Sequence, residues 1–304
     1  MQRPETGTRS ALLDNPRTTE ESRNNRQVPN TMTRRLANIL RTPARNVCRA
    51  AARLNASRTM VLLYHSIGTS KDAVTPANFR DQMQYLNREA TVVPLEDILK
   101  GNHRSATKPL TCAITFDDGY ASVYEVAYPI LRHFGFPALV YVTTDAVGDS
   151  TPKRTENYPG LFPGEMTVRW SQLREMSRDG MVIGSHLCQH KDMTTLTEGE
   201  GLHQLALSKL VITQRLGLPC SHFAYPFGRF NRQNVKWVGT CGYESATTVV
   251  HATVGSHFDV LKIPRICIAP IHGMDDFVAM LRGDFDYLPV VQCARRILKL
   301  PYAL

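Results

Sequence analysis

Residues 111–120 read TCAITFDDGY, an apolar run that ends in two adjacent carboxylates, Asp117 and Asp118, and then a glycine. The β-branched and aromatic residues favour an extended chain, so the stretch predicts a buried strand from Thr111 to Phe116 with a turn at Gly119. At the end of a strand, two neighbouring side chains can enter one pocket and take different chemical roles. The tripeptide alone would equally suit a hydrophilic turn that caps a helix.

On both sides of this stretch, short apolar runs alternate with helical periods. Residues 60–64 predict a buried strand, and Thr75 and Pro76 supply an N-cap and a first-turn proline for a helix. Further strands are expected at 138–143, 181–183, 222–225, 245–249 and 261–266, and further helices at 123–134, 173–176, 202–216, 235–238 and 277–281. The alternation predicts an α/β fold of about seven units, which favours a distorted (β/α) barrel over an open doubly wound sheet. Residues 147–168, rich in proline and glycine, predict a long loop of the kind that shapes substrate grooves.

The formal net charge of +9 is unevenly distributed. Residues 1–58 contain twelve arginines and four acidic residues, so they carry +8 and leave +1 for the rest of the chain. We expect a basic N-terminal extension at 1–58, first disordered and then an amphipathic helix, a catalytic domain at 59–288 and a C-terminal tail at 289–304. The basic helix would either pack loosely on the domain or contact an anionic membrane surface. The nearly neutral domain argues against a specific nucleic-acid partner.

The sequence lacks the features of membrane-spanning, secreted and disulfide-bonded proteins, and this indicates its location and redox state. No apolar run approaches the roughly 18–20 residues of a membrane-spanning helix, and residues 1–30 lack the apolar core of a secretory signal. The seven cysteines are odd in number and show no C-x-x-C spacing, which predicts buried thiols in a reducing compartment. We therefore expect a cytoplasmic protein that the basic helix could hold peripherally at the inner membrane face.

A second group of polar residues follows another short apolar strand. Residues 184–190 read GSHLCQH and place His186 and His190 four positions apart. On a helical turn, side chains at this spacing share a face, so both imidazoles could reach one ion at roughly 2.0–2.1 Å if it is zinc. Two histidines and one aspartate form a triad of ligands with open positions for water and substrate. Both motifs at strand ends of one domain favour a divalent-metal site.

These segments resemble the motifs of the polysaccharide deacetylases, also called carbohydrate esterase family 4 or the NodB-homology domain. The first family motif, T-F-D-D-G, is complete, whereas Leu187 stands where the second motif, H-[ST]-x-x-H, has serine or threonine. The likeness continues in the segments LYHSI at 63–67, FxxQMxxL at 79–86, WxxLxxMxxxG at 170–180 and FAYPFG at 223–228. The whole set is most similar to the branch that acts on poly-N-acetylglucosamine.

The resemblance implies a metal-dependent hydrolase that removes N-acetyl groups from amino-sugar residues of a polysaccharide, oligosaccharide or lipid-linked glycan. It makes Asp117 the general base that takes the proton of the attacking water. It assigns the ligands of a divalent ion, expected to be zinc, to Asp118, His186 and His190. Carbohydrate is then the expected partner.

The resemblance also implies roles around the metal. Arg265 would hold Asp117 ionised, and Trp170 would bind the substrate. Tyr225 would donate its backbone N–H to the oxyanion, with Pro226 fixing the turn. The family's usual late histidine acid has no clean copy here. The remaining candidates for the proton donor are His65, after the first strand, and the later His251, His257 and His272.

Three other functions stay open at this point. The same residues could cleave an O-acetyl ester of xylan type or remove an N-formyl group from a lipid-linked sugar. A non-catalytic carbohydrate-binding relative is a further alternative. The complete set of Asp117, Asp118, His186 and His190 argues against it, because a site released from catalysis would be expected to lose a member.

Overall fold

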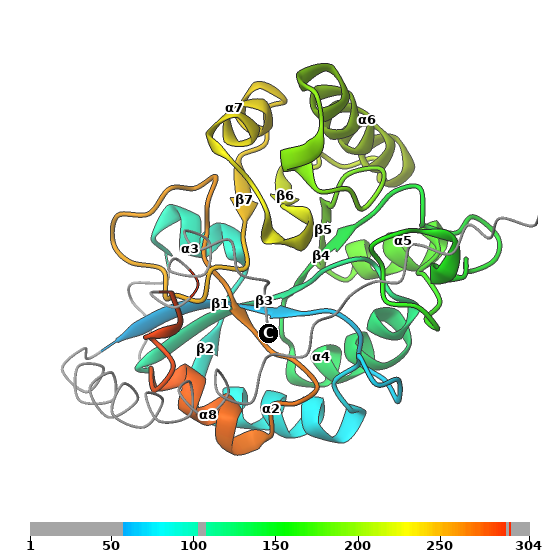
Figure 1. Ribbon diagram of the computed structural model, residues 1–304. Coiled ribbons are helices and arrows are strands. Elements are labelled where there is room, and N and C mark those ends of the chain that lie inside the picture. The colour runs from blue at the N-terminus through cyan, green and yellow to red at the C-terminus, as the bar shows by residue number, and fades with distance from the viewer. Residues whose placement is uncertain (1–56, 103–107, 290–291, 293–304) are drawn as a thin grey trace, which may run out of the picture. The chain divides into compact units, whose positions relative to one another are not determined.

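The computed structural model describes residues 57–102, 108–289 and 292. Within them, one parallel sheet of eight strands is flanked by helices (Figure 1). The strands are β1 (Arg58–Tyr64), β2 (Ala90–Val92), β3 (Leu110–Phe116), β4 (Leu139–Val142), β5 (Val182–Ser185), β6 (His222–Ala224), β7 (Ser245–Thr247) and β8 (Ile266–Cys267). The α-helices are α2 (Pro76–Glu89), α3 (Leu95–Lys100), α4 (Tyr128–Phe134), α5 (Trp170–Arg178), α6 (Glu198–Leu216), α7 (Arg232–Thr240) and α8 (Met274–Leu281).

The sheet curls into a distorted barrel. Its strand order is β7-β6-β5-β4-β3-β1-β8, and β2 also pairs with β3. Thr247 in β7 forms a parallel bridge with Ile263, just before β8, so the chain that leads into β8 joins the two ends of the sheet. The distortion lies at β3, where β2 pairs with residues 110–112 and β4 with residues 115–116 of the same strand. The predicted (β/α) barrel is confirmed.

Most expected elements are present, although several of their ends differ. Helix α6 begins at Glu198, four residues before the expected start, because Thr197 and Glu200 form a capping box there. The expected strand at 261–266 is reduced to β8, a two-residue strand. Strand β2 and helix α3 were not anticipated. The expected loop at 147–168 is irregular apart from the short 3₁₀ turn η3 (Thr155–Asn157).

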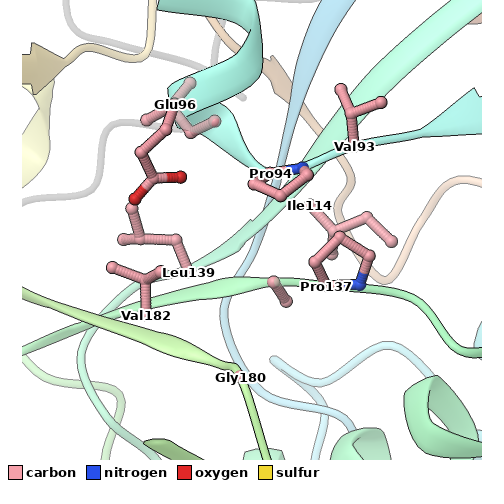
Figure 2. A pocket seen from close by; sticks show the side chains of 10 residues that line it. Val93, Pro94, Glu96, Ile114, Pro137, Leu139, Gly180 and Val182 are labelled. Carbon is pink, nitrogen blue, oxygen red and sulfur yellow. The ribbon is translucent and has the colours of Figure 1, made fainter.

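Helix α3 closes the amino-terminal end of the barrel. Its residues Leu95 and Ile98 pack inside the sheet in a cluster with Val61, Ala113, Leu139 and Tyr141. A cavity of about 10 Å³ lies between α3 and the starts of β4 and β5, beside Glu96 (Figure 2). This volume holds about one water molecule and no sugar. The carboxyl ends of the strands meet at the opposite end of the barrel, which is where barrels of this kind place a substrate site.

The cysteines of the described residues are all free thiols. Cys112, Cys188 and Cys220 are buried, whereas Cys241 and Cys267 are half-buried. Burial raises the pKa of the Cys112 and Cys220 thiols to about 12, so both remain protonated at neutral pH. In the described ranges, no helix has the length and apolar character needed to cross a membrane.

The predicted extension at 1–58 and the predicted tail at 289–304 fall almost entirely outside the described residues. Their boundaries stay predictions. Of the first segment only residues 57 and 58 are described. Arg58 begins β1, and its two terminal guanidinium nitrogens donate to the Asp286 carboxylate at 2.9 Å.

Candidate active site

The polar residues singled out in the sequence converge at the carboxyl ends of neighbouring strands. Asp117 and Asp118 follow β3, and His186 follows β5. His65 follows β1, which pairs with β3 along its whole length. In a parallel sheet these ends lie at one edge, so residues far apart in the chain share one site.

Asp118, His186 and His190 form a buried cluster whose ligand atoms lie within 4.8 Å of one another. Asp118 Oδ1 is 3.4 Å from His186 Nε2 and 3.3 Å from His190 Nε2. Although buried, this oxygen has no hydrogen-bond partner in the structure. A buried carboxylate oxygen without a partner, facing two imidazole nitrogens, suits a divalent cation that all three atoms can bind.

The two histidines of the cluster have different surroundings. Burial would lower the pKa of His186, but the Asp118 and Asp117 carboxylates raise it overall. His186 Nδ1 lies 2.8 Å from the carbonyl oxygen of Ala224 in β6. With the proton on Nδ1, this contact leaves the Nε2 lone pair directed at the cluster. Burial and the neighbouring His186 lower the pKa of His190 to about 4, although the Asp118 carboxylate opposes the shift. His190 is therefore uncharged at neutral pH and can coordinate a metal.

The charge of Asp118 is set by the same cluster. Burial would raise the pKa of its carboxyl group, but the nearby imidazoles of His190 and His186 outweigh burial and hold the pKa well below the usual range. The carboxylate is therefore ionised at neutral pH, as a metal ligand must be.

A strained backbone places these side chains. Asp118, Leu187 and Phe227 have φ values of 75°, 66° and 58°, and they are the non-glycine residues with positive φ in the described parts of the chain. Such conformations cost about 1–3 kcal/mol each and gather at functional sites. The expectation that His186 and His190 share a helical turn is wrong. The left-handed Leu187 bends the chain away from helix and brings His190 back beside His186.

Leu187 also explains how this loop is held without the serine or threonine of the family motif. Its side chain is buried in the core. The carbonyl oxygens of Leu187 and Cys188 accept hydrogen bonds from the N–H groups of Thr144 and Asp145, at 3.1 and 3.0 Å. The loop after β5 is therefore fixed to the loop after β4.

Asp117 stands beside the cluster and pairs with Arg265. The guanidinium binds both carboxylate oxygens, at 2.7 and 2.6 Å, and its Nε donates to the Thr248 carbonyl oxygen at 2.8 Å. Both side chains are buried. Burial would raise the pKa of Asp117, but the charge and hydrogen bonds of Arg265 lower it overall. Asp117 is an ionised carboxylate held in one orientation, able to accept a proton.

Of the candidate proton donors, His65 is an electrostatic neighbour of both Asp117 and Asp118. It is half-buried, and its ring centroid is 5.4 Å from that of Phe162. His251 is buried, and its electrostatic neighbours include Arg58, at the start of β1. His272 Nδ1 accepts a hydrogen bond from the backbone N–H of Ala269 at 3.0 Å, within the loop that contains both residues.

Two expected substrate contacts are not available as predicted. Trp170 is 3% exposed and packs in the core at the start of α5, so it offers no surface to a sugar. The N–H of Tyr225 donates to the Thr247 carbonyl oxygen at 3.1 Å, within the pairing of β6 and β7. Pro226 is placed as expected, at the first position of the 3₁₀ turn η5 (Pro226–Gly228).

Phe227, which the sequence reasoning did not select, lies beside the cluster. Its ring lies 4.3 Å from the His190 ring, centroid to centroid, and is 43% exposed. None of the backbone hydrogen bonds found among the described residues uses its N–H. The FAYPFG segment signals a turn after β6, but only the structure shows where the β6 pairing ends.

Comparison with known proteins agrees with this geometry. Residues 104–246 match the family described as polysaccharide deacetylase. YxkH of Bacillus subtilis is 25% identical over 213 residues, covering 69% of this chain and 71% of that protein. The poly-β-1,6-N-acetyl-D-glucosamine N-deacetylase of Staphylococcus epidermidis is 24% identical over 211 residues, covering 65% and 68%.

Among solved structures, IcaB from Ammonifex degensii superposes with a TM-score of 0.63 at 24% identity, covering 75% of this chain and 97% of that one. At this identity the superposition supports the fold. Residues 104–246, which contain the Asp-His-His cluster, match the polysaccharide deacetylase family, and the related sequences and the barrel agree with that match.

Proposed function

We propose that the chain is a metal-dependent N-deacetylase of N-acetylated amino-sugar residues in a glycan. The observation that carries the proposal is the buried Asp118, His186 and His190 cluster beside an Asp117 held ionised by Arg265. Support for N-acetylglucosamine units as the substrate comes from the Staphylococcus epidermidis relative, whose name states that substrate.

The residues of the cluster fit a divalent cation, and we propose zinc. Two imidazole nitrogens and one carboxylate form the set of protein ligands found at many catalytic zinc sites, with a further position left for water or substrate. The unpartnered Asp118 Oδ1 and the uncharged His190 favour metal over a permanent ion pair. A bound ion would supply Lewis-acid chemistry, polarising the acetyl carbonyl and making a water molecule more acidic.

The residues around the cluster would carry out hydrolysis as follows. Asp117 takes a proton from the water that attacks the acetyl carbon, while Arg265 keeps its carboxylate ionised and aligned. The Phe227 N–H, in place of the Tyr225 N–H, donates to the oxygen that becomes negative in the tetrahedral intermediate. His65 gives a proton to the nitrogen as the C–N bond breaks, so the products are acetate and a free amine.

The test is a substrate panel on the purified chain. We expect acetate release from N-acetylglucosamine oligomers, loss of release after metal removal by a chelator, and recovery after zinc is added back. Acetate from O-acetylated xylan alone would instead indicate an esterase, and formate from an N-formyl sugar would indicate a deformylase. Tight binding of oligomers without any product, in protein shown to contain metal, would indicate a non-catalytic relative and overturn the proposal.

A further inference from the structure

The turn η5 after β6 holds Phe227, whose N–H is the proposed oxyanion donor, in a strained conformation. Its φ of 58° lies in the left-handed region that a phenylalanine seldom adopts. Within the turn, the N–H of Gly228 donates to the Tyr225 carbonyl oxygen at 2.8 Å. The N–H of Arg229 donates to the Pro226 carbonyl oxygen at 3.1 Å. Neither bond involves Phe227 itself, so its position also depends on contacts made by side chains.

The side chain of Arg229 makes such a contact. Its guanidinium carbon lies 5.6 Å from the centroid of the Phe227 ring, within the range of a cation–π interaction. Its Nη1 donates to Asp192 Oδ2 at 2.8 Å. Arg229 therefore joins the Phe227 ring to the loop that follows β5, two residues beyond the metal ligand His190.

Asp192 is a well-fixed partner because its other oxygen is also engaged. Asp192 Oδ1 accepts hydrogen bonds from the Thr194 N–H at 2.9 Å and from Thr194 Oγ1 at 2.7 Å. The Asp192 side chain is 16% exposed, whereas that of Arg229 is 48% exposed. The carboxylate thus offers Arg229 an acceptor whose place is set by its own loop.

The loop after β5 has further anchors that do not involve Arg229. Asn234 is buried in α7, and its Nδ2 donates to the Met193 carbonyl oxygen at 3.1 Å. Nearer to β5, the carbonyl oxygens of Leu187 and Cys188 accept the hydrogen bonds from the loop after β4. Loss of the Arg229 side chain should therefore leave His190 in place and affect the turn that carries Phe227.

We propose that Arg229 is a positioning residue of the proposed deacetylase site, which fixes Phe227 relative to His190 by pairing with Asp192. The rings of Phe227 and His190 lie 4.3 Å apart, centroid to centroid. The inference rests on the proposed function for the role of the Phe227 N–H, but not for the position of its backbone. An oxyanion donor binds the charge that develops in the transition state, so a displaced donor lowers kcat and leaves KM unchanged.

The kinetic test compares wild type with Arg229→Met and with Asp192→Asn, which keeps an oxygen for Thr194 but loses the charge. On N-acetylglucosamine oligomers, kcat should fall about 10-fold in each, less than the roughly 100-fold or greater loss from deleting an oxyanion donor. KM and zinc content should stay at the wild-type values. Arg229→Lys keeps the charge and should recover most of kcat. The double variant should be no slower than either single variant, because both lose the same contact.

The matched control is Arg215→Met. Arg215 Nη1 lies 2.9 Å from Asp149 Oδ1, and the guanidinium carbon lies 5.6 Å from the centroid of the Trp170 ring. Its side chain is also 48% exposed, and neither contact involves the metal-ligand cluster or the turn η5. Its kcat should equal that of wild type. Equal losses of kcat in the two arginine variants, a change confined to KM, or losses that multiply in the double variant would overturn the proposal.

A second measurement does not need turnover. In protein with ¹⁵N-labelled phenylalanine, the heteronuclear NOE of the Phe227 amide reports fast motion of its backbone. Its signal is identified by its absence in Phe227→Leu. The NOE should fall in Arg229→Met and keep its wild-type value in Arg215→Met, and an unchanged value in both would overturn the positioning role. If wild type released no acetate, the proposed function would fail while this measurement still tested the contact.

Discussion

At the scale of single residues, the charge of Asp117 depends on one neighbour. Arg265 meets both of its oxygens inside the barrel, and the aromatic ring of Tyr141 lies 5.6 Å from the guanidinium carbon. Removing one partner of a buried ion pair leaves the other charge without water or a counter-ion. The group that aligns the proposed base is therefore also a group on which stability depends.

We predict that Arg265→Met lowers the free energy of unfolding by about 3–5 kcal/mol, the usual cost of breaking a buried pair. The matched control is Lys262→Met, which removes a surface pair with Asp259 whose side chains are 44% and 45% exposed. It should change stability by less than about 1 kcal/mol. Chemical denaturation of both variants provides the measurement, and similar losses in the two would contradict a buried pair.

Motif spacing was sufficient to select Asp117, Asp118, His186 and His190, because side chains at strand ends converge whatever the details of packing. It was not sufficient to choose which backbone N–H would donate to the oxyanion. The N–H of Tyr225 is used in the pairing of β6 and β7, whereas no backbone hydrogen bond among the described residues uses the N–H of Phe227, two residues later. Where a strand's pairing stops depends on its neighbours in space, so the sequence could not distinguish Tyr225 from Phe227.

At the scale of elements, β4 and β5 fit together inside the barrel because one of them carries a glycine. Gly184 pairs in register with Tyr141. A Cβ atom at 184 would lie 2.6 Å from Tyr141 Cδ1 and 2.9 Å from the His222 carbonyl oxygen. The backbone of β5 therefore gives the Tyr141 ring its space.

Gly184→Ala should lower the free energy of unfolding by about 1–3 kcal/mol, as overpacking of a core does. Gly199→Ala is the matched control, since Gly199 lies in α6 and nothing lies within 4 Å of its added Cβ. Alanine there should stabilise the protein by up to about 1 kcal/mol through helix propensity. Thermal unfolding of the two variants tests the predicted loss of stability in one and the predicted gain in the other. Equal melting temperatures would refute the packing argument.

An acidic residue of helix α3 contacts a histidine of β6, and the strength of this interaction should depend on pH. Glu96 Oε1 lies 2.8 Å from His222 Nε2, whose Nδ1 lies 2.8 Å from Ser245 Oγ. Burial would raise the pKa of Glu96, but the hydrogen bond and charge of His222 lower it overall. An acid with a lowered folded-state pKa stabilises the protein above its unfolded pKa, and this contribution is lost as the pH falls through the folded value.

We therefore predict that Glu96→Gln is less stable than wild type at about pH 6 and that the difference shrinks toward about pH 3. The measurement is the free energy of unfolding across this range for both proteins. A difference that stays constant or grows as the pH falls would contradict the ionised Glu96.

The elements that the sequence analysis missed are short. Strand β2 has three residues and α3 has six, too few for a hydrophobic period to emerge. The long loop before α5 was recognised from its prolines and glycines. The contact of its Phe162 N–H with the Tyr120 hydroxyl and the approach of its Gly160 to His190 were not recognised, because they join residues distant in sequence.

At the scale of the whole molecule, the charge distribution suggests a role for the N-terminal segment. Residues 1–58 carry +8 of the +9 net charge. We propose that this segment holds a cytoplasmic enzyme to an anionic membrane face, at about 1 kcal/mol per basic residue near the surface.

Deleting residues 1–56, which retains Arg58 and its pair with Asp286, should move the protein from the membrane fraction to the soluble fraction. The same shift should follow for the full chain in high salt, because salt screens attraction to anionic lipids. Fractionation that the deletion leaves unchanged would rule out the anchor.

We propose that three residues of the site bind the metal and that a fourth, Asp117, acts as the base without binding it. The most direct measurement combines metal analysis with acetate release from N-acetylglucosamine oligomers for wild type, Asp117→Asn and His190→Ala. We predict that Asp117→Asn keeps its metal and loses activity, whereas His190→Ala loses both. Equal loss of metal in the two variants would contradict this division.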